Sequence, residues 1–147
     1  MPKDVFCADE IYKQVFFETK NFIAAYNIRP LLPGHSLIIS KRHVSSITDL
    51  SDGELADLKK MLKLLVPKLL KAYKADSYNL SINSGENAGM TIDHLHIHIV
   101  PRSGHDIFHW KIVDFYRELQ KERKGYIADI EKEISRLRKL FRYAPAQ

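Results

Sequence analysis

The most regular pattern of hydrophobic and polar positions in this chain lies within residues 85–102. From His94 to Ile99, histidine alternates without interruption with leucine or isoleucine. Such alternation predicts a half-buried β-strand, because successive side chains of a strand point to opposite faces of the sheet. We therefore expect a strand that presents three imidazoles on one face and apolar side chains on the other. Pro101 is expected to end this strand, since proline cannot supply a ladder donor.

Shorter patterns predict the remaining strands of a sheet. The apolar runs 13–18 and 22–28 are joined by residues 19–21, a link short enough for a β-hairpin. Two further runs with strand character occupy residues 36–40 and 77–83. Together with the histidine strand, these segments predict an antiparallel sheet of about five strands.

Helical periodicity is clear in two other regions. The sequence from Ser51 to Glu54 is a capping box, and leucines recur behind it at steps of three and four residues, which predicts an amphipathic helix. Pro67 lies inside this pattern and is expected to kink or divide the helix. Apolar residues spaced 3-4-3-4 between 127 and 141 predict a final helix of about four turns, and a short helix is expected around 112–119.

These elements predict the fold class α+β, with helices packed on the antiparallel sheet. The 147 residues are expected to form a single domain, with a core at about 13–102 and a C-terminal helical extension at about 111–143. Apolar content of 45% and charged content of 28% are typical of a soluble globular protein. No run of about 20 apolar residues and no signal peptide is visible, so we expect a cytoplasmic protein with no membrane partner.

Charge and cysteine content narrow the possible partners. Much of the basic surplus behind the net charge of +5 lies in the helical stretches 59–74 and 121–142, which is typical of solvated helix faces rather than of a nucleic-acid groove. The mild positive field favours a polyanionic substrate such as a nucleotide. The single cysteine, Cys7, excludes an intrachain disulfide and is expected to be a small buried hydrophobe.

Three interpretations of the histidine row are open: a solvated sheet face, a metal site, or covalent catalysis at phosphorus. A His-x-His pair can converge on one zinc ion, but a third ligand from the same strand would have to reach across about 13 Å. The sequence places no cysteine or acidic partner beside the row, so no metal is expected. Neighbouring imidazoles suit nucleophilic attack, charge stabilisation and proton transfer, because each cationic ring lowers the pKa of the next. Covalent catalysis is the interpretation we favour.

The run from His94 to Val100, His-Leu-His-Ile-His-Ile-Val, resembles the signature of the histidine triad superfamily of nucleotide hydrolases and transferases. The stretch from Asn27 to Ile39, which contains Pro-Leu-Leu-Pro-Gly-His, is similar to that family's upstream element. The Gly-x-x-x-Gly-x-Thr loop at 85–91 and the long tail after the row are most similar to the fragile histidine triad branch. That branch cleaves diadenosine polyphosphates and related adenylated compounds, and it releases AMP.

The resemblance implies a role for each histidine of the row. His96 would be the nucleophile that takes the α-phosphoryl group as a covalent AMP–histidine intermediate. His98 would contact the phosphate and assist departure of the leaving group, where transferases carry glutamine. His94 would orient the array together with His35. The resemblance also implies a set of substrate-binding residues: Asn27, Asn83, Gly89, Met90, Thr91, Ile92 and His98.

The resemblance further implies a homodimer that joins two such sheets, and a diadenosine tri- or tetraphosphate substrate. It requires no cofactor, and the N-terminal half lacks the paired cysteines with which some relatives hold a structural zinc. Mg²⁺ could accompany the nucleotide. The number of phosphates is left open, because Asn83 and Met90 stand where the branch commonly has glutamine. Two alternatives also stay open: a phosphoramidase acting on AMP–amine conjugates, and a nucleotide-binding signalling module with little turnover.

Overall fold

The computed structural model describes residues 4–104, 106 and 129–146. Five strands form its sheet: β1 (Val15–Glu18), β2 (Phe22–Tyr26), β3 (Ser36–Ser40), β4 (Ser77–Ser81) and β5 (His96–Arg102). The described α-helices are α1 (Asp52–Ala72) and α3 (Ile130–Phe141). Three short 3₁₀ helices are η1 (Asp9–Lys13), η2 (Ile47–Asp49) and η3 (Glu86–Ala88).

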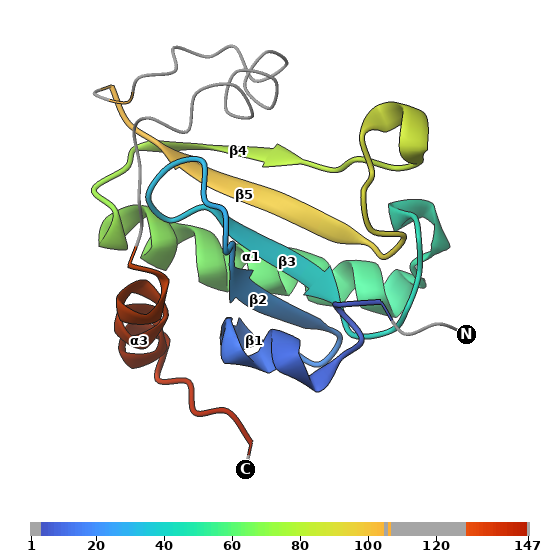
Figure 1. Ribbon diagram of the computed structural model, residues 1–147, viewed down its shortest axis with the longest axis horizontal. Coiled ribbons are helices and arrows are strands. Elements are labelled where there is room, and N and C mark those ends of the chain that lie inside the picture. Colours follow the sequence, from blue (N-terminus) through green and yellow to red (C-terminus); the bar gives the residue numbers. More distant parts are fainter. Residues whose placement is uncertain (1–3, 105, 107–128, 147) are drawn as a thin grey trace.

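The sheet has the strand order β1-β2-β3-β5-β4, and every neighbouring pair is antiparallel. Helix α1 lies across one face of the sheet, and α3 lies beside β1 and β2 (Figure 1). The predicted α+β class and the hairpin between β1 and β2 are confirmed. None of the described helices is long and apolar enough to span a membrane.

The two faces of the sheet have different neighbours. Ile97 and Ile99 of β5 belong to the main hydrophobic core, together with residues of α1 and α3. His96 and His98 lie on the opposite face, where their backbone partners in β3 are Ile39 and Leu37. The alternation within β5 thus separates the core-forming side chains from the histidines, as the sequence pattern predicted.

Helix α1 begins with the predicted capping box. The Ser51 hydroxyl accepts a hydrogen bond from the Glu54 N–H at 3.2 Å, and the Ser51 N–H donates to the Glu54 carboxylate at 2.8 Å. The expected division at Pro67 does not occur, because the helix continues to Ala72. Pro67 and Lys63 are both exposed, so the Lys63 carbonyl that loses its helical partner can bind water instead.

The expectation that Pro101 ends the histidine strand is wrong, because β5 continues to Arg102. The Arg102 carbonyl accepts from the Asp76 N–H at 3.1 Å, so Pro101 directs its nitrogen away from β4. On that side β3 has already ended, with Ser36 opposite Ile99 as the last pair. The missing N–H therefore costs no ladder hydrogen bond.

The C-terminal helix is shorter than expected, with 12 residues in α3. Arg138 ties it to the N-terminal part of the chain by donating to the carbonyls of Tyr12 at 2.7 Å and Val15 at 2.8 Å. The short helix expected around 112–119 lies outside the described residues.

Candidate active site

His94 does not belong to the strand that carries the other two histidines, although the sequence predicted a continuous row. Strand β5 begins at His96, and the His94 N–H closes a tight turn on the Ile92 carbonyl at 2.8 Å. The ring is fully buried, and its Nε2 donates to the Ser40 carbonyl at 2.6 Å. His94 is therefore held at the end of β3, with its backbone carbonyl directed at His96.

His96 is held by this carbonyl in one tautomer. Its Nδ1 lies 2.7 Å from the His94 oxygen, which can only accept a hydrogen bond, so Nδ1 carries the proton. The neutral ring then has its lone pair on Nε2. The His96 and His98 ring centroids are 5.2 Å apart, which places the two imidazoles side by side on the sheet.

A second chain of hydrogen bonds runs through His35 to His98. The Leu31 N–H donates to His35 Nδ1 at 3.0 Å, so the proton of neutral His35 lies on Nε2. That nitrogen is 2.9 Å from His98 Nδ1, which must accept. The proton of neutral His98 is consequently on its own Nε2, which can donate a hydrogen bond to a substrate.

Burial keeps two of these rings neutral. Desolvation, and then the neighbouring His98, lower the pKa of His35 well below its ordinary value. Desolvation, and then repulsion from His96, lower the pKa of His98 to about 4. An anionic phosphate beside His98 would oppose both effects, because a nearby negative charge favours the imidazolium form. The site is thus arranged so that the proton affinity of His98 rises when a polyphosphate binds.

Asn27, one of the expected substrate-binding residues, lies beside His35. Its amide oxygen accepts from the Arg29 N–H at 2.9 Å, and its Nδ2 is 3.3 Å from His35 Nε2. Because His35 Nε2 already carries the proton shared with His98, we treat the longer approach as a contact rather than a hydrogen bond. The structure thus groups Asn27 with the His35–His98 pair.

The remaining predicted substrate-binding residues lie in the loop between β4 and β5. Ser81 pairs with His98, so this loop leaves the sheet near the start of the histidine strand. Gly89 has a φ of 86°, in the left-handed region that favours glycine, and its carbonyl is 3.5 Å from Asn83 Nδ2. The other members are partly buried or exposed: Met90, Thr91 and Ile92.

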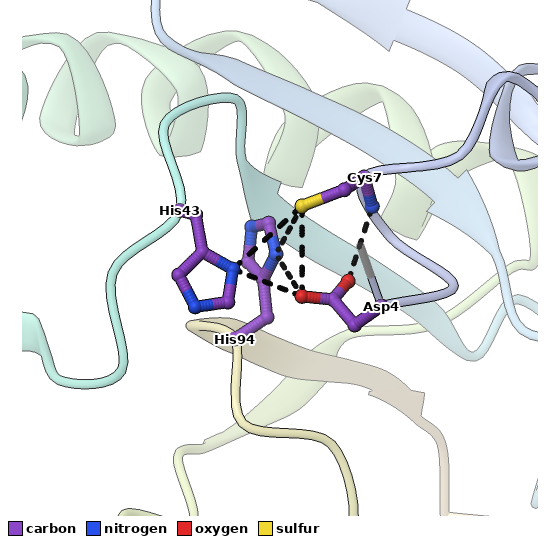
Figure 2. Close-up of side chains that lie close together, drawn as sticks. All are labelled: Asp4, Cys7, His43 and His94. Atoms are coloured by element: carbon purple, nitrogen blue, oxygen red, sulfur yellow. Dashed lines mark hydrogen bonds and ion pairs between the residues drawn. The ribbon is translucent and has the colours of Figure 1, made fainter. Parts of the chain in front are cut away.

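Sequence reasoning missed the N-terminal segment, whose residues show no periodicity. Phe6 packs against the rings of both His94 and His96, with centroid distances of 5.8 and 5.1 Å. Cys7 is half-buried, and its sulfur lies 3.5 Å from His94 Nδ1, so it is not the buried hydrophobe we expected. The sequence shows no acidic or thiol partner beside the histidine row. In the structure, Asp4 and Cys7 lie beside His94 (Figure 2), although they are about ninety residues away from it in the chain.

Comparison with known proteins gives the family of this fold and site. A profile described as the HIT domain matches residues 8–105. The chain belongs to the HIT domain family.

Several relatives and structures are similar over most of the chain. A bis(5'-adenosyl)-triphosphatase of Dictyostelium discoideum is 37% identical over 130 residues, covering 87% of this chain and 85% of the relative. An asymmetrical bis(5'-nucleosyl)-tetraphosphatase of Schizosaccharomyces pombe is 36% identical, covering 88% of this chain and 70% of that protein. The structure of Plasmodium falciparum diadenosine triphosphate hydrolase in complex with Cyclomarin A aligns with a TM-score of 0.69 at 25% identity, covering 88% of this chain and 77% of that one.

Proposed function

We propose that this protein hydrolyses dinucleoside polyphosphates, such as diadenosine tri- or tetraphosphate, at the α-phosphate and releases AMP. The observation that carries the proposal is the hydrogen bond between His96 Nδ1 and the His94 carbonyl, 2.7 Å long. It leaves an unprotonated Nε2 on a ring that cannot turn without losing that bond. The names of the Dictyostelium and Schizosaccharomyces relatives support this class of substrate.

The reaction has two steps. His96 Nε2 attacks the α-phosphorus, a new N–P bond forms, and the bond to the bridging oxygen breaks. His98 donates a hydrogen bond from its Nε2–H to the bridging oxygen, which leaves with the bonding electron pair as the terminal phosphate oxygen of the second nucleotide. Water then attacks the phosphorus of the AMP–histidine, the N–P bond breaks with its electron pair returning to His96 Nε2, the proton of the water passes to solvent, and AMP is released.

Further features of the proposal concern the assembly, the cofactor and the compartment. Apolar side chains Tyr78, Leu80 and Ile82 are 37–44% exposed at every second position along and just beyond β4, the edge strand. Such a row supports the expected homodimer of two sheets. No cofactor is needed for either step, Mg²⁺ could accompany the phosphates, and a cytoplasmic location fits a nucleotide substrate.

Product analysis tests the proposal. Purified protein is incubated with diadenosine triphosphate, diadenosine tetraphosphate or an AMP–amine conjugate, and the nucleotides are separated. We expect AMP with ADP from the first substrate and AMP with ATP from the second. His96→Ala should abolish release, whereas His109→Ala, outside the residues of the family match, should not. Turnover of the AMP–amine conjugate alone would contradict the proposal and identify the protein as a phosphoramidase. Tight nucleotide binding without turnover of any substrate would identify it as a nucleotide-binding module.

A further inference from the structure

Tyr73, the C-cap residue of α1, lies between the C-terminal helix α3 and the turn that carries His35. Its hydroxyl donates a hydrogen bond to Glu133 Oε2 of α3 at 2.5 Å. The Arg136 guanidinium lies over the Tyr73 ring, 4.6 Å from its centroid, and donates to the same Glu133 oxygen at 3.0 Å. Two neighbouring side chains of α3 therefore hold this one tyrosine.

The other side of the Tyr73 ring lies against the turn before β3. A Cβ added to Gly34 would lie 2.6 Å from Tyr73 Cδ2 and 2.9 Å from Pro101 Cγ. The Gly34 backbone is thus packed between these two side chains, in a space that admits no side chain of its own. Pro101 belongs to β5 and follows His98 by three residues, so this packing joins the turn to the histidine strand.

His35 depends on this turn for its position relative to His98. It follows Gly34 and precedes Ser36, whose pairing with Ile99 is the last between β3 and β5. The hydrogen bond from His35 Nε2 to His98 Nδ1, 2.9 Å long, therefore lies just beyond the ladder that aligns the two strands. Because hydrogen bonds weaken steeply when they bend, a small movement of the turn is enough to weaken this one.

The link between Tyr73 and α3 is a directed hydrogen bond in addition to packing. Burial, and then the hydrogen bond to Glu133, raise the pKa of Tyr73 well above its ordinary value, so its hydroxyl stays a donor at neutral pH. A hydrogen bond to a carboxylate is stronger than one between neutral groups. The Glu133 side chain is only 17% exposed, which limits competition from water.

We propose that Tyr73 is a positioning residue through which α3 controls the tautomer of His98. Glu133 holds the Tyr73 ring, and the ring holds the turn at Gly34. The turn in its place keeps His35 within hydrogen-bond distance of His98. This role rests on the proposed function, in which the Nε2–H of His98 contacts the bridging oxygen, but the tautomer itself can be measured without any substrate.

The ring ¹⁵N chemical shifts of His98 are the primary readout, because a protonated and a bare imidazole nitrogen differ and packing alone would not exchange them. In the substrate-free wild type at neutral pH, we expect a protonated Nε2 and a bare Nδ1. Tyr73→Phe keeps the ring and removes the hydroxyl, and it should give intermediate shifts at both nitrogens. A wild type that does not cleave diadenosine triphosphate would contradict the proposed function, whereas this comparison would still test the role of Tyr73.

Kinetics of variants in α3 connect the tautomer to the reaction. Tyr73→Phe and Glu133→Ala should each lower kcat about 3- to 10-fold with KM nearly unchanged. Glu133→Gln keeps an oxygen that can accept from the Tyr73 hydroxyl, so it should recover part of the loss. Glu131→Ala removes an exposed carboxylate from the same first turn of α3 and is the matched control. It should keep the kcat and the His98 shifts of the wild type.

Two results would overturn the proposal. In the first, Tyr73→Phe and Glu133→Ala lower the midpoint of thermal unfolding but keep the wild-type shifts of His98 and the wild-type kcat, so that Tyr73 contributes packing only. In the second, Glu131→Ala lowers kcat as much as Glu133→Ala does. Tyr73→Phe and Glu133→Gln change single polar atoms and open no large cavity, so the comparison of these two folded proteins decides the matter even if Glu133→Ala does not fold.

Discussion

His35 Nε2 lies 2.9 Å from His98 Nδ1, and this hydrogen bond determines which nitrogen of His98 faces the substrate with a proton. The direction of the bond is set one step earlier, by the Leu31 N–H that donates to the other nitrogen of His35. A backbone group of the Pro-Leu-Leu-Pro-Gly-His turn thus controls the protonation of a ring on β5. The turn and the strand act as one unit of the site.

The first prediction concerns the role of this bond. His35→Phe removes the donor, so His98 can adopt the wrong tautomer, and we expect kcat to fall about 10- to 100-fold with little change in KM. His35→Gln retains an N–H near the position of Nε2 and should recover part of the loss. The kcat and KM of both variants and of the wild type are measured by steady-state kinetics. Equal activity of the Phe and Gln variants would show that the tautomer of His98 is not controlled here.

The second prediction is the proton affinity of His98. An NMR titration of the free protein should show His98 neutral down to about pH 4, because burial and the neighbouring His96 lower its pKa. A non-hydrolysable adenosine polyphosphate should raise that pKa, since its charge favours the imidazolium. Titration of His98 near pH 6.5 in the free protein would contradict the account of the site.

The lowered pKa of His98 also predicts how the stability of the protein depends on pH. Between pH 6.5 and about 4 the unfolded chain binds a proton at residue 98 that the folded chain does not. The free energy of unfolding should therefore be fully retained above pH 6.5 and fall as the pH decreases through this window, with His35 acting in the same direction. The free energy of unfolding of the wild type and of His98→Asn is measured in urea at several pH values. If the two proteins lose stability equally as the pH falls, His98 does not cause the pH dependence.

The fourth prediction concerns the glycine before His35. Gly34 has a φ of 88°, and an added Cβ would lie 2.6 Å from the Tyr73 ring and 2.9 Å from Pro101. Gly34→Ala should lower the free energy of unfolding by about 1–3 kcal/mol from backbone strain alone, with the close contacts adding to the loss. Gly53→Ala is the matched control, since its Cβ would meet nothing within 4 Å. Equal stability of the two variants in urea would refute this explanation.

The fifth prediction concerns the attachment of α1 to the first hairpin. Asp57 of α1 accepts hydrogen bonds from the Thr19 hydroxyl at 2.8 Å and from the Asn21 N–H at 2.7 Å. Asp57→Ala should lower the free energy of unfolding by about 1–3 kcal/mol, because two partly buried donors lose their acceptor. Lys63→Ala, on the exposed side of the same helix, should change the unfolding free energy little. If Lys63→Ala lowers the free energy of unfolding as much as Asp57→Ala does, the effect comes from a change in the helix itself and not from the lost hydrogen bonds.

Much of the fold could be predicted because each element carries its own local signal. The alternation through Ile97 and Ile99 marks the core face of β5, and the capping box marks the first residue of α1. The sequence does not show that α1 continues past Pro67 or that β5 continues past Pro101, because the effect of a proline on its element depends on its neighbours. Pro67 is tolerated on an exposed helix face, and Pro101 is tolerated where β3 has ended.

The site was predictable only where its residues are close in sequence or carry a motif. His96 and His98 satisfy both conditions. His94 was assigned to the strand because the alternation continues through it, whereas in the structure its N–H closes a turn on Ile92 and its ring donates to the Ser40 carbonyl. Nothing in the sequence indicated that Asp4 and Cys7 approach His94, because that contact depends on how the N-terminal segment packs.

The central claim is that His96 forms a covalent bond to AMP. The most direct measurement is an intact-protein mass spectrum of His98→Asn after brief mixing with diadenosine triphosphate and a mildly basic quench. We expect a species heavier by one adenylyl group, weaker in the wild type because hydrolysis is faster there, and absent when His96→Ala is added. AMP release without any adduct, or an adduct that persists in the His96→Ala protein, would contradict the claim.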